Sequence, residues 1–390
     1  MPELATGMAG APPSGIRELA NAATGIDGAI RLDLGQPDFP TPEHIVAAAK
    51  RALDEGWTGY TQTQGLRSLR ELLAEKVARR NGYRVSADDV TTAPGGVGVI
   101  AGAFAAVLQA GDEVLLPDPA WPNYELMAAW TQSRVVRYPC PPELGFQPDL
   151  DRLRGLFTPR TRLLVVNSPN NPTGALYPEP VLRELVELAS RNDVWLLSDE
   201  CYDEVVHEGG VVSPASLTAD PRVISAYSFS KTYAMTGWRL GYLTGPRGLV
   251  ATVTKVLESQ SSCAPSIAQK AAEAALAGPQ DCVRVMNAAY RRRRDAVVEM
   301  LRAAEMLISV PRGAFYVMAD VSPSGLPARD FAFRLLRERG VSVAPGSAFG
   351  DVAGGAVRIS LASSDEDLAE GVGRLCDLVA RLAGQGGRGR

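Results

Sequence analysis

Short apolar runs alternate with amphipathic stretches through the first two thirds of the chain. The apolar runs predict buried strands at 113–116, 162–166, 194–197 and 222–227, and a shorter run predicts one at 89–92. Apolar residues at helical spacing predict helices between and before them at 42–55, 66–81, 99–109 and 179–190. Continuous apolar strands that alternate with helices are typical of a mainly parallel sheet covered by helices on both faces. The pattern therefore predicts the α/β class.

The pattern changes after about residue 267. Two long helical stretches extend to about 304, and shorter strands and helices are then predicted at 313–321, 328–339, 341–345, 357–361 and 366–382. We interpret this part as a smaller α/β domain. The expected division is a large domain at 48–280 and a small domain formed by 1–47 and 281–390, with the N-terminal arm (1–15) packed on the small one.

Composition and charge remove several classes of function. The chain has 40 Lys and Arg against 44 Asp and Glu, a net charge of −4, which argues against a broadly basic nucleic-acid binder. No apolar run reaches the roughly 18 residues of a membrane span, and the start lacks the segments of a signal peptide. Five cysteines without CxxC spacing predict a reduced, cytoplasmic protein without a metal site. The basic run at 291–294 is interpreted as a solvated helix face.

Polar side chains follow three of the predicted strands. Asn171 lies in the turn NSPNNPTG, Asp199 and Tyr202 lie in SDECY, and Lys231 lies in SFSK. Ligands of open α/β sheets bind at the carboxyl ends of the strands, so we expect these side chains to meet. Only five lysines occur, and the other four are attributed to codon bias, with no function assigned.

A glycine turn supplies a further feature. Gly95, Gly96 and Gly98 precede a predicted helix, and the free amides of a helix N-terminus suit an anion. A nicotinamide dinucleotide is not favoured, because the acidic residue expected about 20 positions later is missing. Pyridoxal 5′-phosphate has a phosphate for the turn, a ring nitrogen for Asp199 and a carbonyl for Lys231. Its phenolic oxygen suits Asn171 and Tyr202.

The motifs resemble those of a known family. NSPNNPTG, SDECY and SFSKTYAMTGWRLGY resemble, in the same order, the asparagine, aspartate–tyrosine and lysine motifs of class I aminotransferases. Further matches are Gly35 in LDLGQPDFPTP, Tyr60 in GYTQTQG, Trp121 in DPAWPNY and Arg358 in VRIS. The chain thus resembles the aspartate aminotransferase-like, fold type I pyridoxal-phosphate-dependent transferases from about residue 30 to about residue 380.

The resemblance implies a role for each matched residue around the cofactor. Lys231 would form the internal aldimine and carry the proton, Asp199 would pair with the ring nitrogen, and Tyr202 and Asn171 would hold the phenolic oxygen. The phosphate and the ring would be held by Gly96, Val97, Trp121, Ser228, Ser230 and Arg239.

It also implies a substrate site and a partner. Arg358 would bind the substrate α-carboxylate, with Gly35, Trp121 and Asn171 beside it. Tyr60 would reach the cofactor phosphate of a second subunit, which implies a homodimer with shared active sites. Val97 replaces a polar residue that the family often carries in the phosphate loop. No second arginine is evident, which favours neutral, aromatic or sulfur-containing substrates over aspartate.

The expected reaction is ping-pong transamination between an L-amino acid and a 2-oxo acid. A β-eliminating carbon–sulfur lyase is the first alternative, and an oxidising or decarboxylating relative on the same fold is the second. A cofactor-sensing regulator is a hypothesis of another class. It would need a DNA-binding extension, whereas about 30 residues precede Gly35. The amino donor, the acceptor and the pathway stay open.

Overall fold

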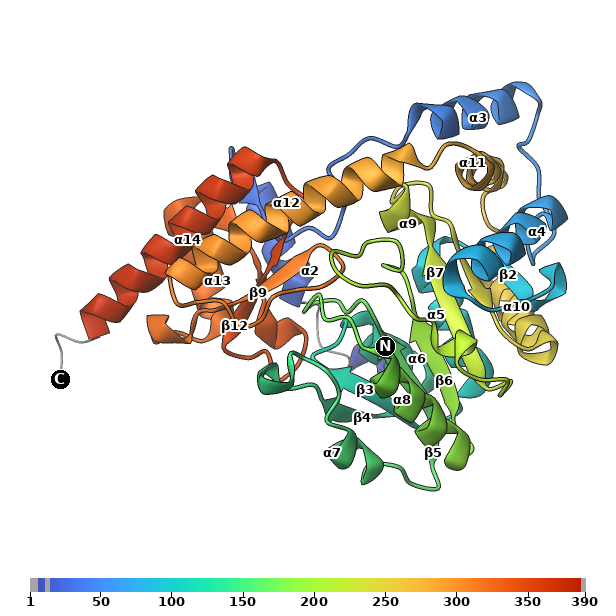
Figure 1. The fold of residues 1–390 in the computed structure, drawn as a ribbon, viewed down its shortest axis with the longest axis horizontal. Coiled ribbons are helices and arrows are strands. Elements are labelled where there is room, and N and C mark those ends of the chain that lie inside the picture. Colours follow the sequence, from blue (N-terminus) through green and yellow to red (C-terminus); the bar gives the residue numbers. More distant parts are fainter. Residues whose placement is uncertain (1–5, 11–14, 387–390) are drawn as a thin grey trace, which may run out of the picture.

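A seven-stranded sheet forms the centre of the computed structural model, which describes residues 6–10 and 15–386. The strand order is β2-β8-β7-β6-β5-β3-β4. β8 runs antiparallel to both neighbours, and the other adjacent pairs are parallel (Figure 1). The strands are β2 (Val90–Ala93), β3 (Glu113–Asp118), β4 (Arg134–Pro139), β5 (Thr161–Asn167), β6 (Trp195–Asp199), β7 (Val223–Ser228) and β8 (Gly241–Thr244).

Helices cover both faces of this sheet. Val114 and Leu116 of β3 belong to one apolar cluster, whereas Leu115 between them belongs to another. Successive side chains of a strand point to opposite faces, so both faces are buried and the apolar runs are continuous. The helices of the first cluster are α5 (Gly95–Val107), α6 (Asn123–Thr131) and α10 (Arg247–Ser261), and those of the second are α7 (Leu150–Arg154) and α8 (Glu179–Arg191).

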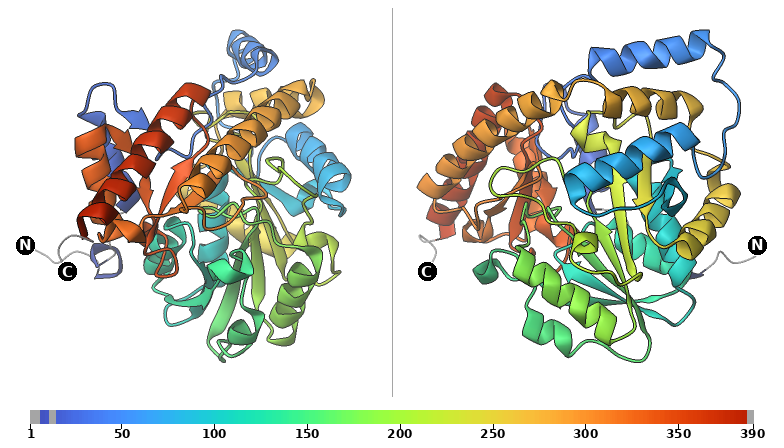
Figure 2. Two further views of the ribbon diagram at one scale, coloured as in Figure 1. Left: turned by 60° about the vertical axis from the view of Figure 1, so that its left-hand side comes forward. Right: turned by 45° about the vertical axis from the view of Figure 1, so that its right-hand side comes forward.

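A further group of helices packs against β2, β7 and β8. It contains α3 (Glu43–Asp54), α4 (Arg67–Lys76), a π-helical turn (Val77–Asn81) and α11 (Ser266–Ala277). Figure 2 shows these helices stacked outside the sheet. The short helix α9 (Phe229–Thr232) follows β7 directly.

The second part of the molecule combines segments from both chain ends. Its antiparallel sheet has the order β11-β12-β9, and β1 pairs with β10 in parallel. One apolar cluster joins Leu19 and Ile30 to residues from Met286 to Leu382. The elements are α2 (Gly15–Thr24), β1 (Ile30–Arg31), α12 (Asp281–Ala303), β9 (Tyr316–Asp320), α13 (Ala328–Arg339), β10 (Val341–Ser342), β11 (Ala344–Pro345), β12 (Ala356–Ser360) and α14 (Asp365–Gly386).

The α/β class with a large mixed sheet and a smaller sheet is confirmed. The exact division at 48–280 stays a prediction, and its first boundary falls inside α3, which packs against α11. The arm differs from expectation where it is described, since α1 (Thr6–Ala9) lies against α6 of the large sheet. Residues 1–5 and 11–14 of the arm lie outside the described residues.

The helix and strand boundaries also differ in places. β4 and β8 were not predicted, and the helix expected at 99–109 begins at Gly95. The helix expected at 66–81 changes to a π-helical turn after Lys76. The strand expected at 341–345 is divided into β10 and β11, which belong to different sheets.

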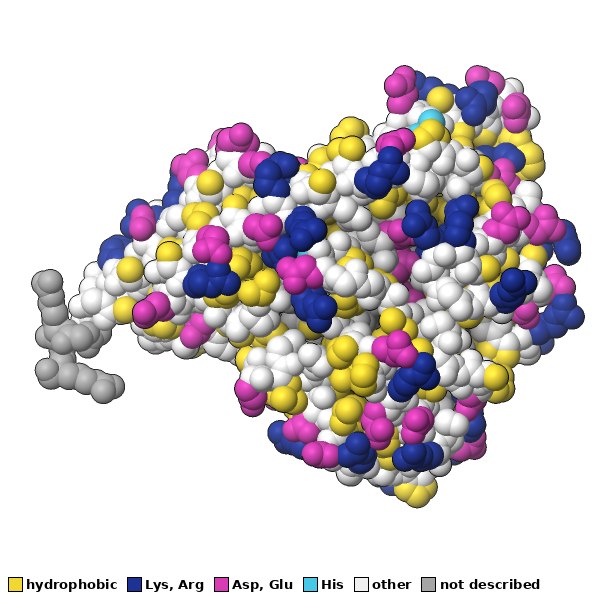
Figure 3. Space-filling model, in the orientation of Figure 1, with side chains coloured by type: hydrophobic (Ala, Val, Ile, Leu, Met, Phe, Trp, Pro, Cys, Tyr) yellow, Lys and Arg dark blue, Asp and Glu magenta, His cyan; other side chains and the backbone are white. Residues whose placement is uncertain are grey.

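The basic run on α12 is not simply a solvated face. Arg293 and Arg294 are buried and pair with Asp38 and Glu208, while Arg292 pairs with Asp365 at the surface. Figure 3 shows basic and acidic side chains interspersed over the face seen in Figure 1. Within the described residues, none of the helices combines the length and the apolar character needed to cross a membrane.

Candidate active site

Lys231 lies on α9, immediately after β7. Ser228 ends the strand and caps the helix, its Oγ accepting a hydrogen bond from Ser230 N at 3.1 Å. The Lys231 Nζ donates to the carbonyl of Gly35 at 2.5 Å. A segment near the N-terminus therefore meets the carboxyl end of the large sheet.

The ammonium group of Lys231 is partly destabilised by its surroundings. Burial lowers the pKa of Lys231 to about 8, and the positive charges of Arg358 and Arg239 act in the same direction. A buried amine with a lowered pKa is a better nucleophile and base near neutral pH than an exposed lysine.

Asp199 ends the neighbouring strand β6 and is buried. Its Oδ2 accepts a hydrogen bond from the hydroxyl of Tyr124, and its Oδ1 accepts one from Cys201 N at 3.1 Å. Burial raises the pKa of Asp199, and the bonds from Tyr124 and Cys201 oppose that rise. The carboxylate is thus prepared for a cationic partner in a site that excludes water.

Arg358 joins the two sheets. It lies on β12, is 2% exposed, and donates to Asn171 Oδ1 at 2.8 Å and to the Asp33 carbonyl at 2.7 Å. Its guanidinium lies over the ring of Tyr316, 4.2 Å from the centroid. Its Nε is buried without a hydrogen-bond partner among the described residues. An unsatisfied donor on a buried cation indicates a place for an anionic ligand.

Tyr202 and Gly35 meet at the same tyrosine. The hydroxyls of Tyr202 and Tyr316 share a hydrogen bond of 2.8 Å. A Cβ on Gly35 would collide with the hydroxyl of Tyr316. Close packing against Tyr316 therefore requires a glycine at position 35.

The N-terminus of α5 forms a concave surface with two other elements. Gly95 has φ +79°, and a Cβ there would lie 2.8 Å from Arg239 Cζ. A Cβ on Gly96 would lie 2.8 Å from Cys201 Sγ and 3.2 Å from Ser228 Cβ. The helix amides, Ser228 and the guanidinium of Arg239 thus face one small volume, a suitable anion site. Val97 follows in the same helical turn.

Trp121 and Tyr60 occupy different environments. Trp121 precedes α6, and its ring packs edge-on against Tyr124 with centroids 5.3 Å apart. Tyr60 lies between α3 and α4 and is 89% exposed. In the described part of this chain, no hydrogen bond or ring contact joins Tyr60 to another predicted site residue.

Sequence reasoning missed Tyr124, Tyr316 and the carbonyl of Asp33. Tyr124 is three residues after Trp121 in DPAWPNY, so the motif contained it. Tyr316 lies in the strand predicted at 313–321, but no local signal places it opposite Tyr202. Tyr316 could be found only once the two sheets were placed together, whereas the contact of Tyr124 with Asp199 lies within the part built on the large sheet.

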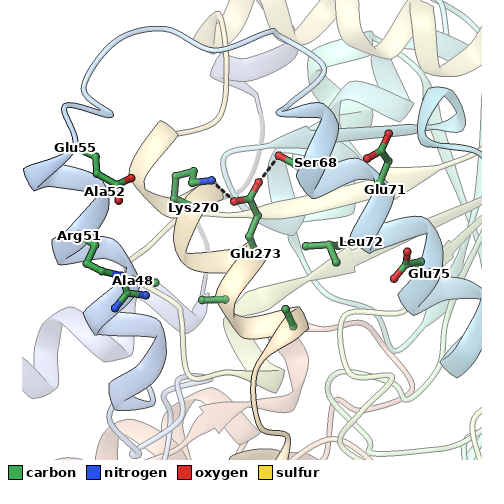
Figure 4. Close-up of a pocket in the computed structure, with 12 residues that line it drawn as sticks. Ala48, Arg51, Ala52, Glu55, Ser68, Glu71, Leu72, Glu75, Lys270 and Glu273 are labelled. Carbon is green, nitrogen blue, oxygen red and sulfur yellow. Dashed lines mark hydrogen bonds and ion pairs between the residues drawn. The ribbon is translucent and has the colours of Figure 1, made fainter.

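A pocket separate from this site lies between α3, α4 and α11 (Figure 4). Glu273 accepts hydrogen bonds there from Ser68, at 2.5 Å, and from Lys270. None of the predicted site residues lines this pocket. The described residues also contain no group of three or more His, Cys, Asp or Glu arranged to hold a metal ion.

Comparisons with known proteins identify the family of the chain. The family model "Aminotransferase class I and II" matches residues 27–375. The aspartate/prephenate aminotransferase of Thermus thermophilus is 42% identical, with 90% of this chain and 91% of the relative covered. The arginine–pyruvate transaminase of Pseudomonas aeruginosa is 40% identical, with 95% and 94% covered.

A solved structure of the aspartate aminotransferase from Thermus thermophilus with maleate has a TM-score of 0.92 and 39% identity, covering 97% of this chain and 100% of that chain. The chain belongs to the class I and II aminotransferases. It is an aminotransferase of fold type I, and transamination is its reaction class.

Proposed function

We propose that this aminotransferase binds pyridoxal 5′-phosphate at the cluster around Lys231 and moves an amino group between an L-amino acid and a 2-oxo acid. The observation that carries the proposal is that Lys231, a half-buried lysine whose pKa is lowered to about 8, lies in one site with the buried carboxylate of Asp199. When bound, the cofactor supplies an electron sink for the substrate α-carbon.

The residues present fit the cofactor at its phosphate end. The cradle between Gly95, Gly96 and Ser228 would be filled by any Cβ, and Arg239 faces it. Ser228, Ser230, Arg239 and the amides of Gly96 and Val97 are proposed to bind the phosphate, since helix amides and a guanidinium both favour an anion.

The remaining groups fit the ring. Asp199 would accept from the protonated ring nitrogen, and Tyr202 and Asn171 would hold the phenolic oxygen. Trp121 would stack on the ring, with its orientation fixed by Tyr124. The fixed donors and acceptors lie in a buried site, where such interactions are stronger than in water.

Lys231 is proposed to move the proton. Its amine would remove a proton from the α-carbon of the bound amino acid. It would then return a proton to the carbon of the cofactor that takes up the amino group. A pKa of about 8 leaves a useful fraction of the amine uncharged near neutral pH.

Arg358 is proposed to bind the α-carboxylate of both substrates. Its buried guanidinium now donates to Asn171 and to the Asp33 carbonyl, and its Nε is free to donate. A carboxylate would complete the donor set with paired hydrogen bonds, which fixes the orientation of the α-carbon beside Lys231.

We further propose a homodimer with shared active sites, in which Tyr60 reaches the cofactor phosphate of the partner subunit. The 89% exposure of Tyr60 in a single chain supports an assignment outside its own site. A cytoplasmic location is proposed because all five cysteines are free.

The test is a visible spectrum of the purified protein during additions of single amino acids without any oxo acid. Related enzymes differ in their named substrates, so aspartate, arginine and phenylalanine are the first donors to compare. Loss of the yellow band with formation of the matching oxo acid is expected. Release of pyruvate and ammonia, or consumption of oxygen, would instead support the lyase or oxidising alternative.

A further inference from the structure

A tight turn follows β6 and has two chemically different sides. Asp203 N donates to the Glu200 carbonyl at 3.0 Å, and Val205 N donates to the Tyr202 carbonyl at 2.9 Å. Asp199 and Tyr202 are in the proposed cofactor site. Glu200 follows Asp199, and Asp203 follows Tyr202. These two carboxylates contact a separate buried polar cluster, so the turn has the proposed cofactor site on one side and this cluster on the other.

Lys76 is the cation of that second cluster. It is 7% exposed, and its Nζ donates to Asn81 Oδ1 at 3.0 Å and to the carboxylate of Asp203. Asn81 Nδ2 donates to Asp203 Oδ2 at 3.0 Å, which closes a three-residue ring of hydrogen bonds. The Lys76 Nζ also lies 4.7 Å from the ring centroid of Tyr227, within the range of a cation–π contact.

The backbone is adapted to this arrangement. α4 ends at Lys76, and the π-helical turn Val77–Asn81 follows. In an α-helix, residues five apart lie on different faces, whereas the i to i+5 pattern of a π-helix places them nearly above one another. The π-helical turn therefore brings Asn81 beside Lys76. Such turns are found often at functional sites.

The cluster connects the ends of two strands. Tyr227 OH donates to Glu200 Oε2 at 3.2 Å, and Ser213 Oγ donates to Glu200 Oε1 at 2.8 Å. Tyr227 immediately precedes Ser228, which begins the segment that carries Lys231. Lys76 and Ser228 also line one narrow cavity. Movement in the cluster would therefore change the position of the β6 turn relative to Lys231.

Charge makes Lys76 necessary to this geometry. Burial opposes its positive charge, but the carboxylates of Asp203, Glu204 and Glu200 outweigh burial and raise the pKa of Lys76. Burial raises the pKa of Glu200 to about 7, and Lys76 opposes that rise. Buried ion pairs contribute little net stability compared with apolar packing, whereas removing one partner leaves a costly unpaired charge. The ion pair of Lys76 and Asp203 therefore fixes one geometry of the turn and adds little to the free energy of unfolding.

We propose that Lys76 is a positioning residue of the aminotransferase reaction, which holds the turn bearing Asp199 and Tyr202 in register with the segment bearing Lys231. It acts through Asp203 and Tyr227 and touches neither cofactor nor substrate. The inference rests on the proposed function, because positioning has meaning only if Asp199, Tyr202 and Lys231 hold the cofactor.

The experiment compares holoenzymes with Lys76→Met and Asp203→Asn, and uses exposed Lys255→Met on α10 as the control. The readouts are the melting temperature, the pH midpoint of the visible absorption of bound cofactor, kcat and KM. A displaced Tyr202 no longer holds the phenolic oxygen, so the midpoint rises in both variants. A fall in kcat of about 10- to 100-fold is expected with little change in KM, as for other small displacements of catalytic groups.

The outcomes separate positioning from stability. A lower melting temperature with an unchanged midpoint and unchanged kcat in both variants would overturn the proposal. If Lys76→Met does not fold, the double variant Lys76→Met/Asp203→Asn removes the unpaired charge and is judged by the same midpoint and kcat. Wild-type protein that binds no cofactor would contradict the proposed function and this inference together, whereas normal wild-type and unchanged variants would contradict the role of Lys76 alone.

Discussion

The hydroxyl of Tyr124 donates a hydrogen bond to Oδ2 of Asp199, and both side chains are buried at the carboxyl edge of the large sheet. Tyr124 lies on α6, next to Trp121, and its ring stacks on Phe104. The carboxylate proposed to face the ring nitrogen is therefore fixed by the same helix that is proposed to position the stacking tryptophan.

Tyr124→Phe should keep the packing and remove only this donor. Asp199 then loses a bond that lowers its pKa, so it holds a cationic ring nitrogen less well. Hydrogen bonds to charged groups contribute about 1.5–3 kcal/mol, so kcat/KM should fall by about tenfold or more. Cofactor titration and steady-state kinetics measure the effect.

Tyr138→Phe is the matched control. Tyr138 is also fully buried, and its hydroxyl donates to the Val165 carbonyl at 2.7 Å, so it loses one hydrogen bond without involving Asp199. Equal losses of kcat/KM in the two variants would show that Tyr124 acts through stability alone.

The sequence predicted the centre of this site because its residues follow strands. Asn171, Asp199 and Lys231 each come directly after an apolar run, and parallel strands bring their carboxyl ends to one edge. Tyr124 and Tyr316 carried no such signal, since an aromatic residue on a helix or strand is usually packing. Their contacts depend on elements that are distant along the chain.

Other features were not predicted from the sequence, for equally specific reasons. β4 carries two arginines and is mostly part-exposed at the sheet edge, so it lacks a continuous apolar run. β8 has only four residues, and the first of them is Gly241. It also runs antiparallel to β7, whereas the pattern that predicts the neighbouring strands is typical of parallel ones. Lys76 was attributed to codon bias and given no function, because helical spacing cannot show that Asp203 and Tyr227 would enclose it.

The pKa of Lys231 leads to a prediction about cofactor uptake. Only the uncharged amine can bond to the cofactor, so the rate of uptake by apo-protein should rise with pH through about 8. Stopped-flow absorbance at a series of pH values measures it. Lys231→Ala should remain folded but take up cofactor without this pH dependence, and its turnover should be negligible.

The lowered pKa of Lys231 also determines the direction in which the stability of the apo-protein changes with pH. The folded pKa of about 8 lies below the ordinary 10.5, so the unfolded chain binds more protons between these values. The free energy of unfolding should therefore rise with pH across that window. Comparison with Lys231→Met in denaturant titrations isolates the contribution of this lysine, and identical pH slopes would contradict the burial of a charged amine.

Arg358→Lys tests the carboxylate site. A lysine keeps the charge but cannot form paired hydrogen bonds, and it leaves Asn171 without the 2.8 Å contact. KM for every amino acid and oxo acid should rise by at least about tenfold, the factor that corresponds to 1.4 kcal/mol. The cofactor spectrum should stay normal. Arg284→Lys, on the exposed face of α12, is the control, and an equal KM in both variants would remove Arg358 from substrate binding.

Gly95→Ala tests the phosphate cradle. The substitution meets two obstacles, since Gly95 has φ +79° and its Cβ would lie 2.8 Å from Arg239 Cζ. Gly111→Ala has a similar φ of +88° with nothing within 4 Å of the added Cβ, so it reports the backbone strain alone. Both variants should lose about 1 kcal/mol or more of stability.

Only Gly95→Ala should also displace Arg239 and weaken cofactor binding, by about tenfold or more, because a guanidinium–phosphate contact is lost. Equilibrium titration with the cofactor measures this difference, and equal affinities in the two variants would place the phosphate away from the N-terminus of α5.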